Sequence, residues 1–80
     1  MTLVEYRNLD ELEQLLLFWK AVRVGEFTEG EYTYECRQLD SFYLELTTNG
    51  GSFVQLYPHM DTDRLERYLD RFDLDILLFQ

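Results

Sequence analysis

Three stretches of alternating apolar and polar residues constrain this chain more than any other feature. They span residues 31–37, 42–47 and 53–57, and short polar or glycine-rich breaks separate them. Alternation with a period of two residues is typical of β-strands that bury one face. The breaks are short enough for consecutive strands to pair as antiparallel hairpins. The sequence therefore predicts a meander of three strands.

The position of each turn follows from keeping the apolar side chains on one face, because a register shift of one residue moves them to the other. A three-residue loop over 49–51 places Leu46 opposite an apolar residue of the next strand, whereas a two-residue loop within this stretch splits the apolar rows. By the same reasoning the preceding loop is expected at 38–40, with Cys36 opposite Phe42.

Residues 8–25, before the meander, show helical spacing. Asn8 is the expected N-cap, with Glu11 completing a capping box, and Gly25 is the expected C-terminal stop. The buried stripe of this helix is predicted to consist of residues that recur every three or four positions: Leu9, Leu12, Leu15, Leu16, Trp19 and Val22.

A second helix is predicted over residues 60–72, after Pro58 ends the third strand. Asp61 or Thr62 is its expected cap, and its buried stripe is predicted to be Leu65, Tyr68, Leu69 and Phe72. The aliphatic and aromatic content of 74–80 favours a last strand, with a helical extension as the alternative.

We therefore expect a single domain, 1–80, of the α+β class. Its order is α-β-β-β-α-β. It has two layers: an antiparallel meander of three to four strands, with both helices on one face.

The charge of the chain points to the kind of partner. Sixteen acids against seven bases give a formal net charge of −9, and residues 26–63 hold eight of those acids with Arg37 as the single base. Such a surface repels a phosphate backbone and attracts a basic protein, so we expect a basic protein partner and no direct nucleic-acid binding. The alternative is that the acidity only keeps a small protein soluble.

The second face of the predicted sheet is the candidate docking surface, because both helices are expected on the first. Aromatic rings among carboxylates suit protein recognition, since rings supply contact area and acids steer a basic partner. The predicted partner-binding residues are Glu26, Glu29, Glu31, Glu35, Tyr43, Glu45, Phe53 and Tyr57. The alternatives are that the rings only stabilise the sheet, or are buried by the chain termini or in a homodimer.

Carboxylates spaced along a sheet can imitate nucleic-acid phosphates, and small acidic phage proteins of the anti-restriction and anti-CRISPR kind resemble this chain in size, charge and mixed α/β build. That resemblance implies an inhibitor that occupies the basic groove of a target protein. The α-β-β-β-α order also resembles the double-stranded RNA-binding domain. However, Asp61 and Asp63 stand where that fold has phosphate-binding lysines.

The sequence predicts neither an enzyme nor a cofactor or metal protein. Cys36 and His59 are the single cysteine and histidine, and no nucleophile motif surrounds them. Asp61 and Asp63 could bind a metal together with Glu66, but helix capping explains these aspartates better, since no calcium-loop pattern follows. The acidic N-terminus and the shortness of the apolar runs argue against a secretory signal or a membrane span, and predict a cytoplasmic protein.

Overall fold

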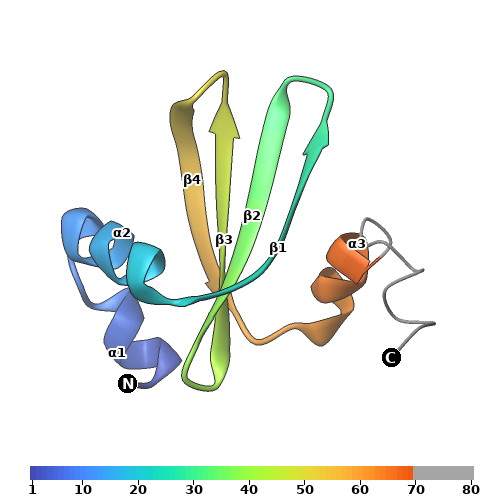
Figure 1. Ribbon diagram of the computed structural model, residues 1–80. Helices are drawn as coiled ribbons and strands as arrows, with labels where there is room; N and C mark the ends of the chain where they lie inside the picture. Colours follow the sequence, from blue (N-terminus) through green and yellow to red (C-terminus); the bar gives the residue numbers. More distant parts are fainter. Residues whose placement is uncertain (70–80) are drawn as a thin grey trace.

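The computed structural model describes residues 1–69, and it forms a four-stranded antiparallel sheet flanked by helices (Figure 1). The strands follow the chain in the order β1-β2-β3-β4, so the predicted α+β meander is confirmed. Its elements are α1 (Leu3–Arg7), α2 (Glu11–Lys20), β1 (Val22–Glu29), β2 (Tyr32–Leu39), β3 (Phe42–Asn49), β4 (Ser52–His59), the 3-10 helix η1 (Thr62–Leu65) and α3 (Glu66–Leu69).

The prediction of one helix over 8–25 is wrong at both ends. Two helices precede the sheet, and Asn8 is the C-cap of the first rather than the N-cap of the second. Asp10 caps α2 by accepting a hydrogen bond from the Glu13 amide at 2.8 Å. The chain becomes extended at Ala21 and enters β1, so Gly25 lies inside a strand.

The turn between β2 and β3 is shorter than predicted. Leu39 faces Phe42, so the turn contains only Asp40 and one further residue. Asp40 adopts a left-handed conformation (φ 53°), which a two-residue hairpin turn requires and which aspartate tolerates better than most residues. Cys36 consequently pairs with Glu45 and not with Phe42. The odd-numbered residues of β3 therefore share a face with Cys36, where the even-numbered residues were predicted.

The turn between β3 and β4 is also a two-residue turn, made by Gly50 and Gly51, both with positive φ. A β-bulge compensates for it: Thr47 pairs with Gln55 and Thr48 with Phe53, which leaves Val54 without a partner on β3. The extra residue restores the apolar register, because Leu46 then faces Leu56. The predicted loop over 49–51 and its register are wrong, although Leu46 still faces an apolar residue of the next strand.

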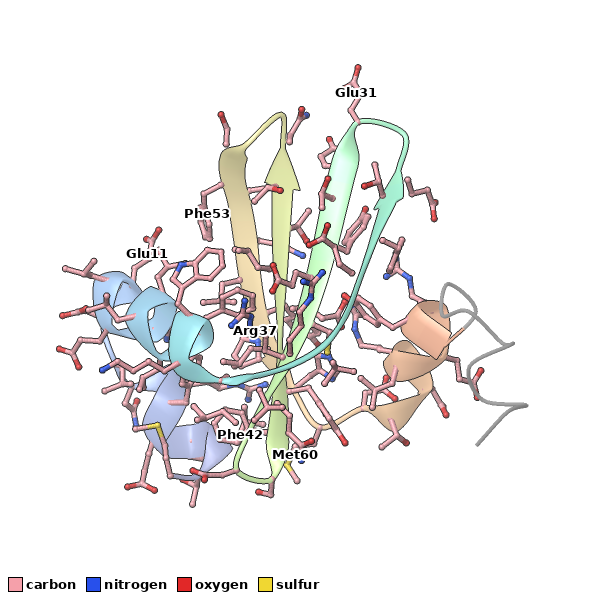
Figure 2. The ribbon with its side chains drawn as sticks, viewed as in Figure 1. Glu11, Glu31, Arg37, Phe42, Phe53 and Met60 are labelled. Atoms are coloured by element: carbon pink, nitrogen blue, oxygen red, sulfur yellow. The ribbon has the colours of Figure 1, made fainter. Side chains whose placement is uncertain are left out.

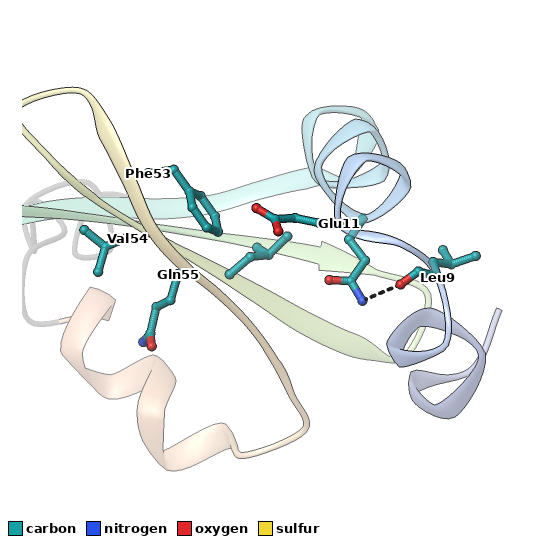
Figure 3. A pocket seen from close by; sticks show the side chains of 7 residues that line it. Leu9, Glu11, Phe53, Val54 and Gln55 are labelled. Atoms are coloured by element: carbon teal, nitrogen blue, oxygen red, sulfur yellow. Dashed lines mark hydrogen bonds between the residues drawn. The ribbon is translucent and has the colours of Figure 1, made fainter.

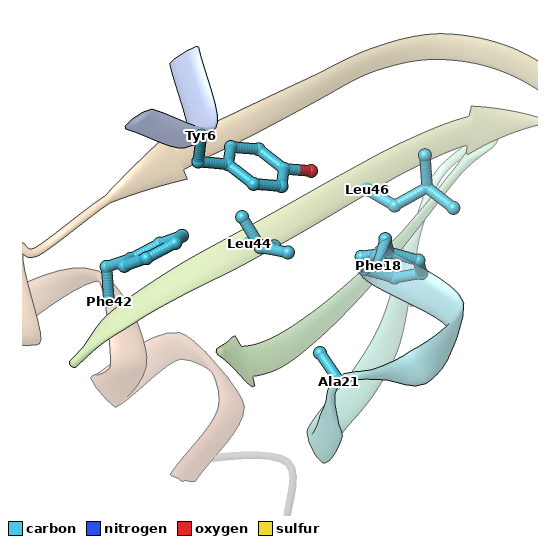
Figure 4. Packing of buried hydrophobic residues seen from close by; sticks show 6 residues of the cluster. All are labelled: Tyr6, Phe18, Ala21, Phe42, Leu44 and Leu46. Carbon is cyan, nitrogen blue, oxygen red and sulfur yellow. The ribbon is translucent and has the colours of Figure 1, made fainter. Parts of the chain in front are cut away.

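The sheet carries a core on each face. On one face α1 and α2 pack on β3 (Figure 4), in a cluster of Tyr6, Phe18, Ala21, Phe42, Leu44 and Leu46. On the opposite face Tyr68 of α3 packs on Phe27 and Cys36. Helices therefore lie on both faces, and the expectation of both helices on one face is wrong. The changed pairing of β2 with β3 explains this. It places Cys36 of β2 on the opposite face from Leu44 of β3, so each face of the sheet has apolar residues.

The predicted stripe of α2 is rotated in the structure. Phe18 is fully buried, whereas Leu12, Leu16 and Trp19 are 67%, 53% and 56% exposed. The helix has apolar residues around most of its circumference, so spacing alone allowed two orientations. In the second helical region, Tyr68 is buried and Leu65 partly buried as predicted. The Leu69 side chain, Phe72 and the predicted strand over 74–80 lie outside the described part.

Candidate functional site

The tips of the β1–β2 and β3–β4 hairpins extend beyond the helices (Figures 1 and 2). We define residues 26–34 and 47–55 as the projecting sheet. Glu31 lies at the tip of the β1–β2 hairpin, and Phe53 lies on β4 on the way to the other tip. At its base Phe27 and Tyr34 pack against α3, whereas residues 28–32 and 50–55, nearer the two tips, are exposed. These tips are accessible to another molecule.

Charge on the described surface is strongly one-sided. Among residues 1–69, eleven acidic side chains are exposed, against three exposed bases, which are Arg7, Lys20 and Arg23. The projecting sheet holds three acids and no base; these acids are Glu26, Glu29 and Glu31. A basic partner would thus meet carboxylates at this end of the molecule.

The remaining described bases are used inside the fold. Arg37 donates to Glu35 at 2.7 Å and lies over the ring of Phe18 at 5.0 Å. Arg67 lies 4.9 Å from the ring centre of Tyr34, where it helps to hold α3 against the sheet. These contacts take arginines away from the surface and leave the exposed acids less compensated.

The structure separates the three aromatic residues that were expected to act together. Tyr43 faces His59 and Tyr57 faces Glu45, so both rings lie on the α3 side of the sheet. Phe53 faces Thr48 beyond the bulge, which places it on the side of α2. The predicted shared aromatic surface is therefore wrong, because one bulge residue transfers Phe53 to the other face.

The predicted carboxylates also divide into two groups. Glu45 is 2% exposed and Glu35 is largely buried beside Arg37, so neither can contact a partner in this fold. Glu26, Glu29 and Glu31 are exposed. Glu26 lies on the α2 side of β1, and Glu29 lies on the α3 side.

Glu45 is the centre of a buried polar cluster between β3, β4 and the η1–α3 segment. Arg64 Nε donates to its Oε2 at 2.7 Å, and Tyr68 donates its hydroxyl proton to Oε1 at 3.0 Å. His59 Nε2 lies 2.6 Å from Oε2, although Nε2 has no acceptor in hydrogen-bonding alignment among the described residues. Both carboxylate oxygens thus have positive or polar partners, as a buried charge requires.

His59 is held in one tautomer by its second nitrogen. The Asp61 amide donates to Nδ1 at 3.1 Å, so Nδ1 is an acceptor and the ring proton of the neutral imidazole is on Nε2. The imidazole also stacks on Tyr57, with ring centres 5.3 Å apart. Asp61 in turn accepts from the Asp63 amide at 2.9 Å, so the capping role predicted for Asp61 is confirmed.

Cys36 lies under the same cluster, and its chemistry is that of a packed side chain. Burial, and to a smaller degree the nearby Glu45 charge, raises the pKa of the Cys36 thiol to about 12. A thiol with so high a pKa is a poor nucleophile at neutral pH. Burial followed by the Glu45 charge also raises the pKa of Tyr68 above its usual range. The cluster attaches η1 and α3 to the sheet through the hydrogen bonds that Arg64 and Tyr68 donate to Glu45.

A groove of about 440 Å³ runs between α2 and β4 (Figure 3). Phe53 and Glu11 point toward each other across it. Gln14 also lines the groove and donates to the Leu9 carbonyl at 3.2 Å. Sequence reasoning did not predict this groove or the exposed apolar side of α2. The available signal was that α2 carries more apolar residues than one buried stripe can hold.

Within residues 1–69, no set of three or more His, Cys, Asp or Glu side chains is arranged to hold a metal ion. The described helices are all too short or too polar to cross a membrane. Neither a family model, nor a curated protein, nor a solved structure matches this chain.

Proposed function

We propose that this protein is a non-enzymatic, acidic interaction module that binds a protein partner with a basic groove through the projecting sheet. One observation carries the proposal: the only charged residues of the projecting sheet are acids, and it extends beyond the helices. Charges placed this way raise the association rate with a partner of opposite sign.

Both faces of the projecting sheet carry an acid and an aromatic ring. A partner with a groove that encloses the sheet therefore fits better than a flat partner. Glu26 and Phe53 lie on one face, while Glu29 and Tyr32 lie on the other. Phe53 and Tyr32 are each close to half exposed, so an aromatic anchor is available on both sides. A partner that encloses the sheet end would contact both rings and all three acids. The inhibitor that imitates nucleic acid is one form of this proposal.

A co-purification experiment with paired variants tests it. The tagged protein is used to capture partners from a lysate at low and moderate salt, as wild type and as two double variants. Glu29→Lys with Glu31→Lys changes the projecting sheet, and Asp63→Lys with Glu66→Lys makes the same total change of charge on η1 and α3. We expect a partner that wild type and the second variant retain and that the first variant loses.

Salt supplies the second readout. Binding steered by exposed acids weakens as ionic strength rises, because exposed charges are screened over about 10 Å at 0.1 M salt. The Glu29 and Glu31 variant should also show a weaker dependence on salt than wild type. Equal loss of binding in both double variants would mean that net charge alone attracts the partner, and it would overturn the assignment to the projecting sheet.

A further inference from the structure

Helix α2 exposes an apolar stripe beside the side chains that it buries against the sheet, and the Trp19 ring at the end of this stripe also contacts Phe18 and the Arg37 guanidinium. Leu12, Leu16 and Trp19 follow one another at intervals of four and three residues, so they lie on one side of the helix. Each is more than half exposed. A single exposed leucine needs no explanation, but three aligned apolar side chains on one helix mark an interaction surface.

We propose that this stripe is the contact surface between two copies of the chain, with the two α2 helices packed antiparallel about a two-fold axis near Leu16. In a two-fold contact the same patch serves both partners, so the patch must complement itself. The α2 stripe meets this condition in its apolar residues and in its charges. The dimer is a property separate from the partner binding proposed above, because it uses a different surface.

The charges beside the stripe are arranged for an antiparallel copy. Glu13 lies three residues before Leu16 and Lys20 lies four residues after it. Both line one groove beside the helix together with Leu16, so they lie on the same flank of the stripe. A two-fold axis near Leu16 therefore brings Glu13 of each copy next to Lys20 of the other. In a parallel two-fold arrangement the flanks that carry Glu13 and Lys20 would lie on opposite sides of the contact, so these charges would not meet.

The groove gives the second copy a place for its side chains. It has a volume of about 260 Å³ and is lined by Met1, Leu9, Glu13, Leu16, Leu17 and Lys20. Its walls are mostly apolar, with the two opposite charges at Glu13 and Lys20. A leucine from a second α2 can enter it while the charged ends meet at its borders. Lys20 is one of only three exposed bases in the described part of the chain, and it stands at this border.

Salt distinguishes this contact from partner binding. Two chains of net charge −9 repel each other, and salt screens that repulsion, so dimerisation should strengthen as ionic strength rises. Binding of a basic partner should weaken over the same range. Failure of one proposal therefore leaves the other measurable.

Sedimentation or light scattering of the full chain tests the dimer over concentrations on the order of 10 µM to 1 mM, where contacts of modest area associate. Trp19 is the single tryptophan, so its emission reports the stripe directly. We expect the mass to rise from monomer to dimer and the Trp19 emission to shift to shorter wavelength together. Leu16→Glu should raise the dimer Kd more than about tenfold. Val4→Glu, an equal change at an exposed position of α1, should leave it unaltered.

A charge exchange tests the antiparallel arrangement. Glu13→Lys and Lys20→Glu should each weaken the dimer by about three- to tenfold, since each places like charges together at two symmetric positions. The double variant should recover wild-type association. A monomer at every concentration, a dimer that persists in Leu16→Glu, or a double variant no better than the single ones would overturn the proposal. A Trp19 emission that is shifted at all concentrations in a monomer would show that the chain covers the stripe itself, which would also overturn it.

Discussion

Arg64 Nε lies 2.7 Å from Glu45 Oε2, and this contact joins the last described helical segment to the middle of the sheet. The hydrogen bond to Glu45 also raises the pKa of the Arg64 guanidinium, so Arg64 stays charged at neutral pH. Glu45 is one of the most buried residues of the fold, yet its neighbours on β3 are apolar. The position of η1 and α3 therefore depends on keeping one buried carboxylate satisfied.

Removing Arg64 should destabilise the protein. We expect Arg64→Ala to lower the free energy of unfolding by about 2–3 kcal/mol, less than the 3–5 kcal/mol of a fully buried pair, because the Arg64 side chain is one-third exposed. Chemical denaturation measures this. Adding Glu45→Gln should recover part of the loss, since it removes the buried charge. An Arg64→Ala variant as stable as wild type would contradict a structural role for the cluster.

Stability should fall in alkaline solution. Burial raises the pKa of the Cys36 thiol from 9.0 to about 12, and burial raises the pKa of Tyr6 from 10.0 to about 12. The folded state therefore keeps these protons where the unfolded state releases them. The resulting stabilisation is fully present below pH 9 and is lost as pH rises to about 12. Thermal melts between pH 7 and 11 should show a shallower decline for Cys36→Ala than for wild type. Identical slopes would contradict the buried position of the thiol.

Arg37 should be hard to replace, even by lysine. Its Nη1 donates to the carbonyls of Trp19 and Ala21, where α2 ends, while its Nε donates to Glu35. A lysine has one charged nitrogen and cannot reproduce this fork. We expect Arg37→Lys to cost about 1–3 kcal/mol of unfolding free energy, judged from hydrogen bonds to charged groups. Arg23→Lys, in an exposed ion pair, is the matched control and should change stability by less than about 0.5 kcal/mol.

The β3–β4 turn should tolerate little at Gly51. This residue has φ +87°, a conformation that costs a residue with a Cβ about 1–2 kcal/mol. Gly51→Val should lower the unfolding free energy by at least that amount, because a β-branched residue fits such a backbone poorly. Ser52→Val, at the adjacent extended position, should be neutral by the same urea titration. A neutral Gly51→Val would mean that the turn has another geometry in solution.

The sequence predicted the strands well because alternation is a local signal. The segments containing Tyr34, Leu44 and Leu56 are strands in the structure, and they pair in the predicted order. The registers between them were wrong for two reasons: the β2–β3 turn at Asp40 is one residue shorter than predicted, and the β-bulge at Val54 has no signature in the alternation that it interrupts. The first strand was missed for a related reason. A second bulge, at Val24, breaks the period just after α2.

The candidate site was predicted only in part, because exposure depends on how elements pack. Glu26, Glu29 and Glu31 are exposed at the projecting end, as the docking hypothesis requires. Glu45 had the same appearance in the sequence, and its burial depends on Arg64, nineteen residues further along the chain. No local pattern relates two residues so far apart. The exposed stripe of α2 was missed because leucines at this helical spacing are also typical of a buried helix face.

Amide chemical-shift mapping of the isotope-labelled protein with its captured basic partner tests the central proposal most directly. We predict that the perturbed amides concentrate in residues 26–34 and 47–55, on both faces of the projecting sheet. Perturbations confined to α1, α2 or the η1–α3 segment, with the projecting sheet unchanged, would contradict it.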